Sequence, residues 1–183
     1  MRSTNLESLQ KGKRVYLRHP GRGDLEEFLS LVSASRGLHR PWIYPPSHEQ
    51  EFYAYLDRAS SERFLGFFVC LLQTDAIVGV ANLSEIVRGL FQNAYLGFYG
   101  HISYSGQGLM KEGLQLVLRH AFRKVRLHRI EANVQPKNGR SLALVRALGF
   151  RREGFSPKYL KVGGRWRDHE RWALLAEDCE RGV

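Results

Sequence analysis

Cysteine is scarce in this chain, which contains only two, Cys70 and Cys179, among its 183 residues. Neither belongs to a Cys-x-x-Cys pattern and no His-Glu-x-x-His pattern occurs, so the sequence predicts neither a disulfide framework nor a zinc site. We expect two reduced thiols and no bound metal. Free thiols are typical of proteins in a reducing compartment, which favours a cytoplasmic location.

Long apolar runs are missing as well. No stretch approaches the about 18 apolar residues of a membrane-spanning helix, and residues 1–6 lack the apolar core of a signal peptide. No linker, internal repeat or low-complexity tract is apparent, while 43% of the residues are hydrophobic. We therefore expect residues 1–183 to form a single soluble domain that does not contact a membrane.

Acidic residues are fewer than basic ones: 18 Asp and Glu stand against 28 Lys and Arg, which gives a net charge of +10. This excess favours encounters with acidic proteins, nucleic acid or phosphate-bearing ligands, and charge alone does not choose among them. Because charge carries no base preference, we expect no specific nucleic-acid binding.

Two common phosphate motifs are absent, but a third kind of phosphate site is indicated. There is no Gly-Lys-Ser/Thr, and a dinucleotide fingerprint would need a glycine where Lys111 stands. A glycine-broken loop, residues 103–110, precedes apolar residues that recur at helical spacing through residues 110–125. The start of a helix has unpaired N–H groups and partial positive charge, and glycines let an anion approach them. The loop therefore predicts an anion site, with an ordinary tight turn as the alternative.

This loop lies between two predicted strands. Residues 93–99 precede it, and residues 129–135 alternate polar and apolar side chains after the helix, which together make a βαβ unit. A short helix then opens at Asn138 and Ser141 and ends near Phe150. Both side chains can cap unpaired N–H groups at that helix start.

The remaining elements are expected to form the scaffold. Helices are predicted from Asp24 to near Gly37 and over residues 49–59. Strands are predicted at residues 15–18, 64–72, 77–83, 159–162 and 165–174, with turns at residues 73–75 and at Gly163-Gly164.

A set of short motifs is spread across these segments: Gly106-Gln107-Gly108, His128 to Val134, Pro136-Lys137-Asn138, Ser141, Leu148-Gly149-Phe150 and Trp166-Arg167-Asp168-His169. Together they resemble the Gcn5-related N-acetyltransferases (GNAT), in particular the RimJ/RimL-like branch that acetylates the N-termini of ribosomal proteins. The resemblance implies an α/β (α+β) fold. Its sheet would be mixed, mostly antiparallel and strongly twisted, flanked by helices, and splayed between residues 93–99 and 129–135 so that a pantetheine arm can enter.

The resemblance implies an enzyme that transfers an acetyl group from acetyl-CoA to an amine. Asn138 would contact the pantetheine, and Ser141 would lie near the sulfur. Ser103 stands where the family has Gln or Arg, which removes a side chain but leaves the backbone amides for the pyrophosphate. The implied cofactor contacts are Ile102, Ser103, Tyr104, Ser105, Gly106, Gln107, Gly108, Leu109, Met110, Asn138, Arg140 and Ser141.

The implied catalytic residues depart from the family pattern. The glutamate of the RimI-type branch is replaced by Asn133 and its tyrosine by Val145. The RimL-like branch uses a hydroxyl, present here as Ser141, and a glutamate, replaced here by Lys158. Glu131 shares a strand face with Asn133 and either acts through a water or pairs with a neighbouring arginine. Our catalytic candidates are Ser141, Glu131 and Asn133.

The absence of the family's catalytic glutamates suggests which kind of amine is the acceptor. At pH 7 an α-amine is roughly a tenth deprotonated, whereas a lysine is deprotonated in only about one molecule in 2,500. With the resemblance, this favours a protein N-terminus, such as that of a ribosomal protein. A small amine (polyamine, aminoglycoside or amino acid analogue) is the enzymatic alternative, for which Glu49 and Glu51 are the nearby carboxylates. A catalytically weak CoA-binding module is the other alternative.

The candidate acceptor walls are Trp42, Tyr44, Tyr159 and Asp168. For the first two, packing at the edge of the core is an equal alternative, and Asp168 can instead fix a turn. The histidines match no metal or nucleophile pattern and are interpreted as structural, with His169 the one to test first. Whether two copies form a homodimer is left open by the sequence.

Overall fold

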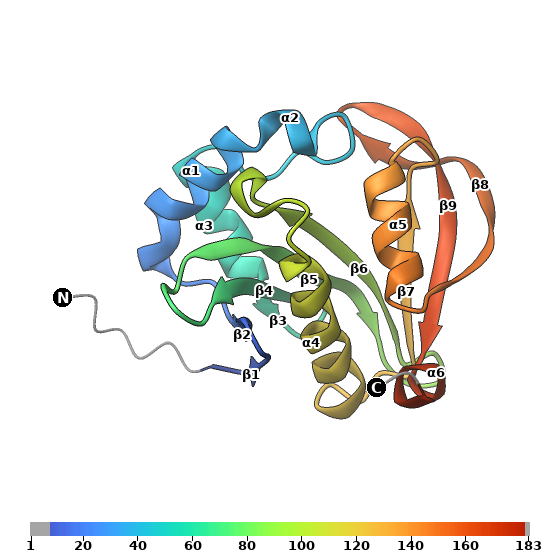
Figure 1. Ribbon diagram of the computed structural model, residues 1–183. Helices are drawn as coiled ribbons and strands as arrows, with labels where there is room; N and C mark the ends of the chain where they lie inside the picture. Colours follow the sequence, from blue (N-terminus) through green and yellow to red (C-terminus); the bar gives the residue numbers. More distant parts are fainter. Residues whose placement is uncertain (1–7, 182–183) are drawn as a thin grey trace.

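A computed structural model describes residues 8–181 and contains one twisted sheet with helices on both faces (Figure 1). The strands follow the order β1-β2-β4-β5-β6-β7-β9-β8, and β3 pairs with β4 outside this path. The strands are β1 (Gln10–Lys11), β2 (Val15–Arg18), β3 (Ser60–Ser61), β4 (Phe64–Leu71), β5 (Ile77–Val87), β6 (Asn93–Gly100), β7 (Arg129–Val134), β8 (Arg151–Val162) and β9 (Arg165–Leu175).

The predicted mixed, mostly antiparallel sheet is confirmed. Among the described strands only β6 and β7 pair in parallel, and the other neighbouring pairs are antiparallel. The parallel pair arises because helix α4 (Leu109–Arg123) carries the chain from the end of β6 back to the start of β7. This is the expected βαβ unit, and it places the start of α4 beside the far end of β6.

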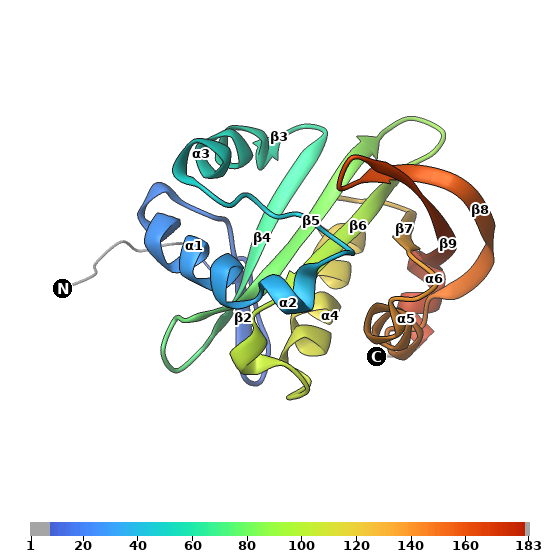
Figure 2. The same ribbon diagram turned by 90° about the horizontal axis from the view of Figure 1, so that it is seen from above.

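The helices divide between the two faces of the sheet (Figures 1 and 2). The first helices cover one face, and α4 covers the other, with α5 beside it along β7. The remaining helical elements are η1 (Arg22–Asp24), α1 (Leu25–Ala34), α2 (Arg36–His39), α3 (Glu49–Arg58), η2 (Ile102–Tyr104), α5 (Gly139–Ala147) and α6 (Ala176–Arg181). Among the described residues, no helix has the length and apolar character needed to cross a membrane.

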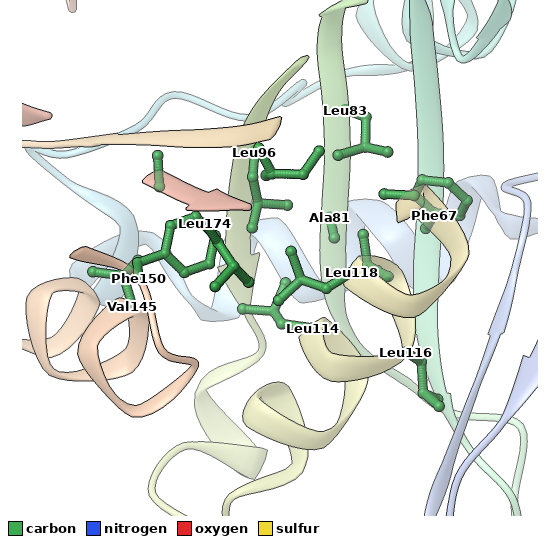
Figure 3. Packing of buried hydrophobic residues seen from close by; sticks show 14 of the residues in the cluster. Phe67, Ala81, Leu83, Leu96, Leu114, Leu116, Leu118, Val145, Phe150 and Leu174 are labelled. Carbon is green, nitrogen blue, oxygen red and sulfur yellow. The ribbon is translucent and has the colours of Figure 1, made fainter. Parts of the chain in front are cut away.

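Alternating strand residues feed two apolar cores, one for each face. In β4, Phe67 faces the core under α4, whereas Phe68 faces the core under α1 and α3. The α4 side is seen from close by in Figure 3, where Leu114 and Leu118 of that helix lie over the sheet. Burying a side chain of this size stabilises the fold by about 1.5–3 kcal/mol, so these contacts fix the helix against the strands.

One predicted strand was too short. β8 begins at Arg151 rather than at residue 159. Its first half was missed because it is a polar edge strand bonded to β9 alone, so it lacks apolar alternation and contains Pro157. The ladder is interrupted between Ser156 and Leu160, where Lys158 has a positive φ of 48°. Lys158 therefore belongs to a bulge.

Smaller differences have local causes. The predicted helix ending near Gly37 is two helices, because the chain breaks at Ser35, whose Oγ accepts the N–H of Ile102 at 3.0 Å. The short β1, β3 and α6 were not predicted. The turn at Gly163-Gly164 is confirmed, since both glycines have positive φ, as a two-residue hairpin turn requires.

We expect Gly113→Ala to destabilise the protein. A Cβ at Gly113 would overlap Val69, whose Cγ2 lies 2.6 Å from the ideal position. Overpacking of this kind costs about 1–3 kcal/mol, which outweighs the gain of about 1 kcal/mol from replacing a helical glycine by alanine. Urea denaturation of Gly37→Ala, where the methyl group meets open space in α2, is the control. Equal stability of the two variants would contradict the close packing of α4.

Candidate functional site

The parallel strands β6 and β7 part after three residue pairs. They pair from Asn93–Arg129 to Tyr95–Glu131, and beyond that β6 continues to Gly100 without pairing to β7 (Figure 2). The predicted splay is therefore confirmed. Backbone groups along the free edge of β6 are left for another partner, since such groups are costly to leave unpaired.

A cleft of about 1030 Å³ occupies this opening. The ends of β6 and β7 form its floor, and the starts of α4 and α5 lie on the two sides of the opening (Figure 1). Residues from α2 and the segment after it, including Trp42, form part of one wall. The cleft thus runs from the glycine-broken loop to Trp42 and the end of β7.

The glycine-broken loop does lie at a helix start. Gly106 and Gly108 have φ of 79° and 75°, and α4 begins at Leu109. A side chain would be strained at such φ values, so glycine is what this turn requires. Within the described residues, no hydrogen bond occupies the backbone N–H groups from Gly106 to Lys111. These amides, with Gly106 and Gly108 on the cleft wall, are free to bind an anion.

This helix start is fixed by a contact that the sequence did not reveal. Glu112, in the first turn of α4, accepts hydrogen bonds from the backbone N–H and the Nε of Arg14 at 2.7 and 3.0 Å. Burial alone would raise the pKa of Glu112, but these hydrogen bonds outweigh it and hold the pKa below its usual range. Arg14 also donates to the carbonyl oxygen of Gln107 at 3.0 Å. The loop is therefore tied to the strand β2.

The charges around the cleft are one-sided. Lys111, Lys137 and Arg140 line it, whereas none of the described lining residues is Asp or Glu. The cations come from the start of α4 and from the segment that leads into α5, near the free amides. This donor set fits a ligand that carries several phosphate groups.

The start of α5 combines capping with access to the cleft. Asn138 Oδ1 accepts the backbone N–H of Ser141 at 3.3 Å, so Asn138 caps the helix as predicted. Both residues also line the cleft. The Ser141 hydroxyl is not used by this cap and is available to a ligand.

The end of β7 provides a polar, uncharged surface. Asn133 and Gln135 point to the same face by strand alternation, and both line the cleft. Gln135 donates to the carbonyl oxygen of Trp42 at 3.2 Å, which joins the strand to the segment after α2. Asn133 Oδ1 is buried without a hydrogen-bond partner. A buried oxygen of this kind costs free energy unless a ligand supplies a donor.

Glu131 lies outside the residues that line the cleft. It accepts a hydrogen bond from Arg129 Nε at 2.8 Å, and Arg129 also binds Glu153. The alternative of a strand-face glutamate paired with a neighbouring arginine is therefore confirmed. Val145, at the position of the missing tyrosine, is buried in the core.

The other predicted residues divide between the cleft and its surroundings. Trp42 lines the cleft. Tyr44 instead packs against the β8–β9 turn. Its ring lies so close to Gly163 that a Cβ there would come within 2.6 Å of it. Asp168 fixes the β8 bulge by accepting the N–H of Lys158 at 2.8 Å, and Tyr159 lies on β8. The predicted cofactor residues in the cleft are Tyr104, Ser105, Gly106, Gly108, Met110, Asn138, Arg140 and Ser141, whereas Ile102, Ser103, Gln107 and Leu109 flank it.

Among the residues that line the cleft, Gln135 and His39 were not predicted as site residues, and His169 was interpreted as structural. Gln135 could have been found from its alternation with Asn133. His39, whose Nε2 lies 2.8 Å from the carbonyl oxygen of Gly100, and His169 come from segments far from the motif. No spacing signal in the sequence links them to it. The described residues contain no group of three or more His, Cys, Asp or Glu that could hold a metal ion.

The fold and the cleft together define a class of protein. A sheet opened at its parallel pair, with a cationic helix start facing the opening, is the architecture of N-acyltransferases that use acyl-CoA. Residues 14–151 match the family model described as Acetyltransferase (GNAT) domain, and the chain belongs to this family. The protein is an N-acetyltransferase.

Two proteins of known sequence illustrate the range of its relatives. The chain is 32% identical over 179 residues to the probable N-acetyltransferase YjcK of Bacillus subtilis (strain 168), covering 93% of this chain and 99% of that protein. It is 44% identical over 106 residues to the ribosomal protein uS5-alanine N-acetyltransferase of Escherichia coli (strain K12). That second match covers 58% of this chain and 55% of the relative.

Solved structures agree on the fold. RimJ of Mycobacterium smegmatis in complex with CoA-disulfide superposes with a TM-score of 0.80 and 30% identity, covering 89% of this chain and 82% of that one. Spermidine N-acetyltransferase from Vibrio cholerae in complex with CoA and spermine gives a TM-score of 0.78, covering 92% and 99%. At 22% identity the latter likeness concerns the fold alone.

We expect Gly106→Ala to weaken CoA binding about tenfold or more. The methyl group would enter the anion site, and a left-handed φ costs a non-glycine residue about 1–2 kcal/mol. Isothermal titration calorimetry with CoA measures the effect. Gly89→Ala is a matched control, because Gly89 has a φ of 70°, open space around its Cβ and no place in the cleft. Equal CoA affinity in both variants would contradict the anion site.

Proposed function

We propose that this protein transfers the acetyl group of acetyl-CoA to the N-terminal α-amine of a protein. The observation that carries the proposal is the charge distribution of the cleft, which has cations near the helix starts and no carboxylate among its described lining residues. The relative that acts on ribosomal protein uS5 supports the same acceptor class.

The residues of the cleft would hold acetyl-CoA in three parts. The amides of residues 106–111, with Lys111 and the nearby Lys137 and Arg140, would bind the phosphate groups. The free edge of β6 would pair with the amides of the pantetheine arm. Asn138 and Ser141 would then lie near the thioester. The bound ligand supplies an activated acetyl group, and CoA-disulfide in the RimJ neighbour supports this assignment.

The opposite end of the cleft suits the α-amine at the start of a peptide chain. Asn133 Oδ1 lacks a donor, and the N–H groups of an acceptor amine would provide one. Trp42, Leu38 and Ile43 add apolar surface for the first side chain. Uncharged amides and apolar walls can hold a neutral amine without stabilising its ammonium form. An α-amine needs little help to reach that neutral form at pH 7.

Catalysis by these residues would rest on positioning. Holding two reactants in the correct geometry contributes about 7–11 kcal/mol to lowering a barrier in favourable cases. The Ser141 hydroxyl would donate its proton to the departing thiolate. Asn133 would orient the amine through Oδ1, which replaces the role that a glutamate base has in the RimI-type branch.

The alternative of a small polyamine acceptor has no support in the cleft. Polyamines carry several positive charges, and their recognition calls for carboxylates. Glu49 and Glu51 do not line the cleft, and Glu51 accepts the backbone N–H of Ser47 at 2.7 Å. This distribution supports an α-amine as the proposed acceptor.

We expect a peptide with a free N-terminus to be acetylated about two orders of magnitude faster, in kcat/KM at pH 7, than an N-blocked peptide with one lysine. The factor follows from the deprotonated fractions of the two amines. Release of free thiol from acetyl-CoA, followed over a panel of peptides and spermidine, is the measurement. Spermidine or the lysine peptide as the best substrate would refute the assignment.

We expect Ser141→Ala to lower kcat about tenfold or more, because the departing thiolate loses its proton donor, while CoA affinity changes little. The cap is retained, since Asn138 binds the backbone of residue 141. Ser103→Ala, on the loop but outside the cleft lining, is the control. Single-turnover kinetics separate the two effects. An unchanged kcat in Ser141→Ala would remove the hydroxyl from the mechanism.

A further inference from the structure

His169 is a buried histidine to which the mechanism above assigns no role. Its side chain lies on β9 and is only 3% exposed, yet it lines the cleft. The last register pair between β7 and β9 is Val134–Glu170, so His169 comes next to Gln135 at the acceptor end. A histidine here faces the same polar surface as Asn133.

The hydrogen bonds of His169 define which of its nitrogens carries the proton. Nδ1 lies 2.9 Å from the carbonyl oxygen of Arg167. A carbonyl only accepts, so Nδ1 donates, and in the neutral ring Nε2 keeps its lone pair. Nε2 makes no hydrogen bond with any described residue. It is the ring atom available to a ligand in the cleft.

The surroundings keep His169 neutral at pH 7. Burial lowers the pKa of His169, and the bond to Arg167 and the charge of Asp168 offset this only in part. From β8, the ring of Tyr159 faces it with centroids 6.3 Å apart. From β7, its neighbours Asn133 and Gln135 carry no charge. On β9 itself, Arg167 and Arg171 share the strand face of His169 by alternation. Asp168 is the charged group that raises its pKa, and Asp168 also binds the N–H of Lys158.

The other histidines of the cleft are not equivalent. His39 lies at the end of α2 rather than beside Asn133, and its Nε2 donates to the carbonyl oxygen of Gly100. His101 uses Nδ1 to accept the N–H of Ser103 at 3.0 Å and lies beside the glycine-broken loop. His169 is the one whose unprotonated nitrogen is open at the acceptor end.

We propose that His169 Nε2 accepts the proton that the acceptor ammonium loses before it attacks. The freed lone pair of the amine then forms the C–N bond to the acetyl carbon as the C–S bond breaks. The proton remaining in excess on nitrogen passes to the thiolate by way of Ser141, and His169 returns its own proton to water. The inference rests on the proposed cleft chemistry but holds for any acceptor amine.

The pH dependence of kcat/KM tests this role. Below the acceptor pKa of about 7.7–8.0, free amine falls tenfold per pH unit, and an enzyme without the base must follow that fall. We expect His169→Gln to lose about a hundredfold at pH 6.5 and less than about fivefold at pH 9. A structural role would give the same loss at every pH, and that result would overturn the proposal.

His120→Gln is the matched control. Burial also lowers the pKa of His120, and its Nδ1 has no partner. His120 belongs to α4, however, and its ring packs against Phe67 outside the cleft. We expect its kcat/KM to keep the shape of the wild-type pH profile. A pH-dependent loss in His120→Gln equal to that in His169→Gln would also contradict the proposal.

A measurement without turnover gives a second test. Nitrogen-15 NMR of the full chain, with the His169 signals assigned by their loss in His169→Gln, should show Nδ1 protonated and Nε2 bare at pH 7. Protonation on Nε2, or a charged ring at pH 7, would overturn the proposal. If spermidine proves the best acceptor while the pH-dependent loss persists, the proposed function fails and the role of His169 stands.

Discussion

The structure depends on the point at which β6 and β7 stop pairing. Three residue pairs hold the two strands together, and beyond them the strands diverge. Backbone N–H and C=O groups are obligatory hydrogen-bonding groups, so an open edge inside a folded protein persists only if something else pairs with it. The same divergence creates the cleft, exposes the free edge of β6 and brings the starts of α4 and α5 to opposite parts of one opening.

Two further constraints give this opening its chemistry. Glu112 and Arg14 tie the start of α4 to β2, and Gly113 lets the helix approach Val69 closely, so the amides of the glycine-broken loop are held in place. The cations then lie at the helix starts, and the acceptor end is lined by Asn133, Gln135 and His169. In the proposed reaction, a phosphate-bearing ligand and an amine would therefore bind at different ends of one cleft.

Local patterns predicted what depends on neighbouring residues. The glycine-broken loop, the apolar face of α4, the alternation in β7 and the Asn138 cap are read within a few residues of sequence, and all are present. The contacts that complete the site join distant segments: Arg14 and Glu112 are 98 residues apart, and Trp42 and Gln135 are 93 apart. No periodicity reports such pairs. The first half of β8 escaped prediction for a different reason, since an exposed edge strand needs no apolar face.

The contact of Tyr44 with Gly163 has a consequence for how the cleft responds to its ligands. Together with the bond from Gln135 to Trp42, it fastens the two halves of the sheet at the end opposite the β6–β7 pairs (Figure 1). We expect an opening fastened at both ends to resist hinge motion. Such an opening is preorganised, so little conformational entropy would be lost when a ligand binds. The free energy of the contacts would then contribute to affinity, because none of it would be needed to close the cleft.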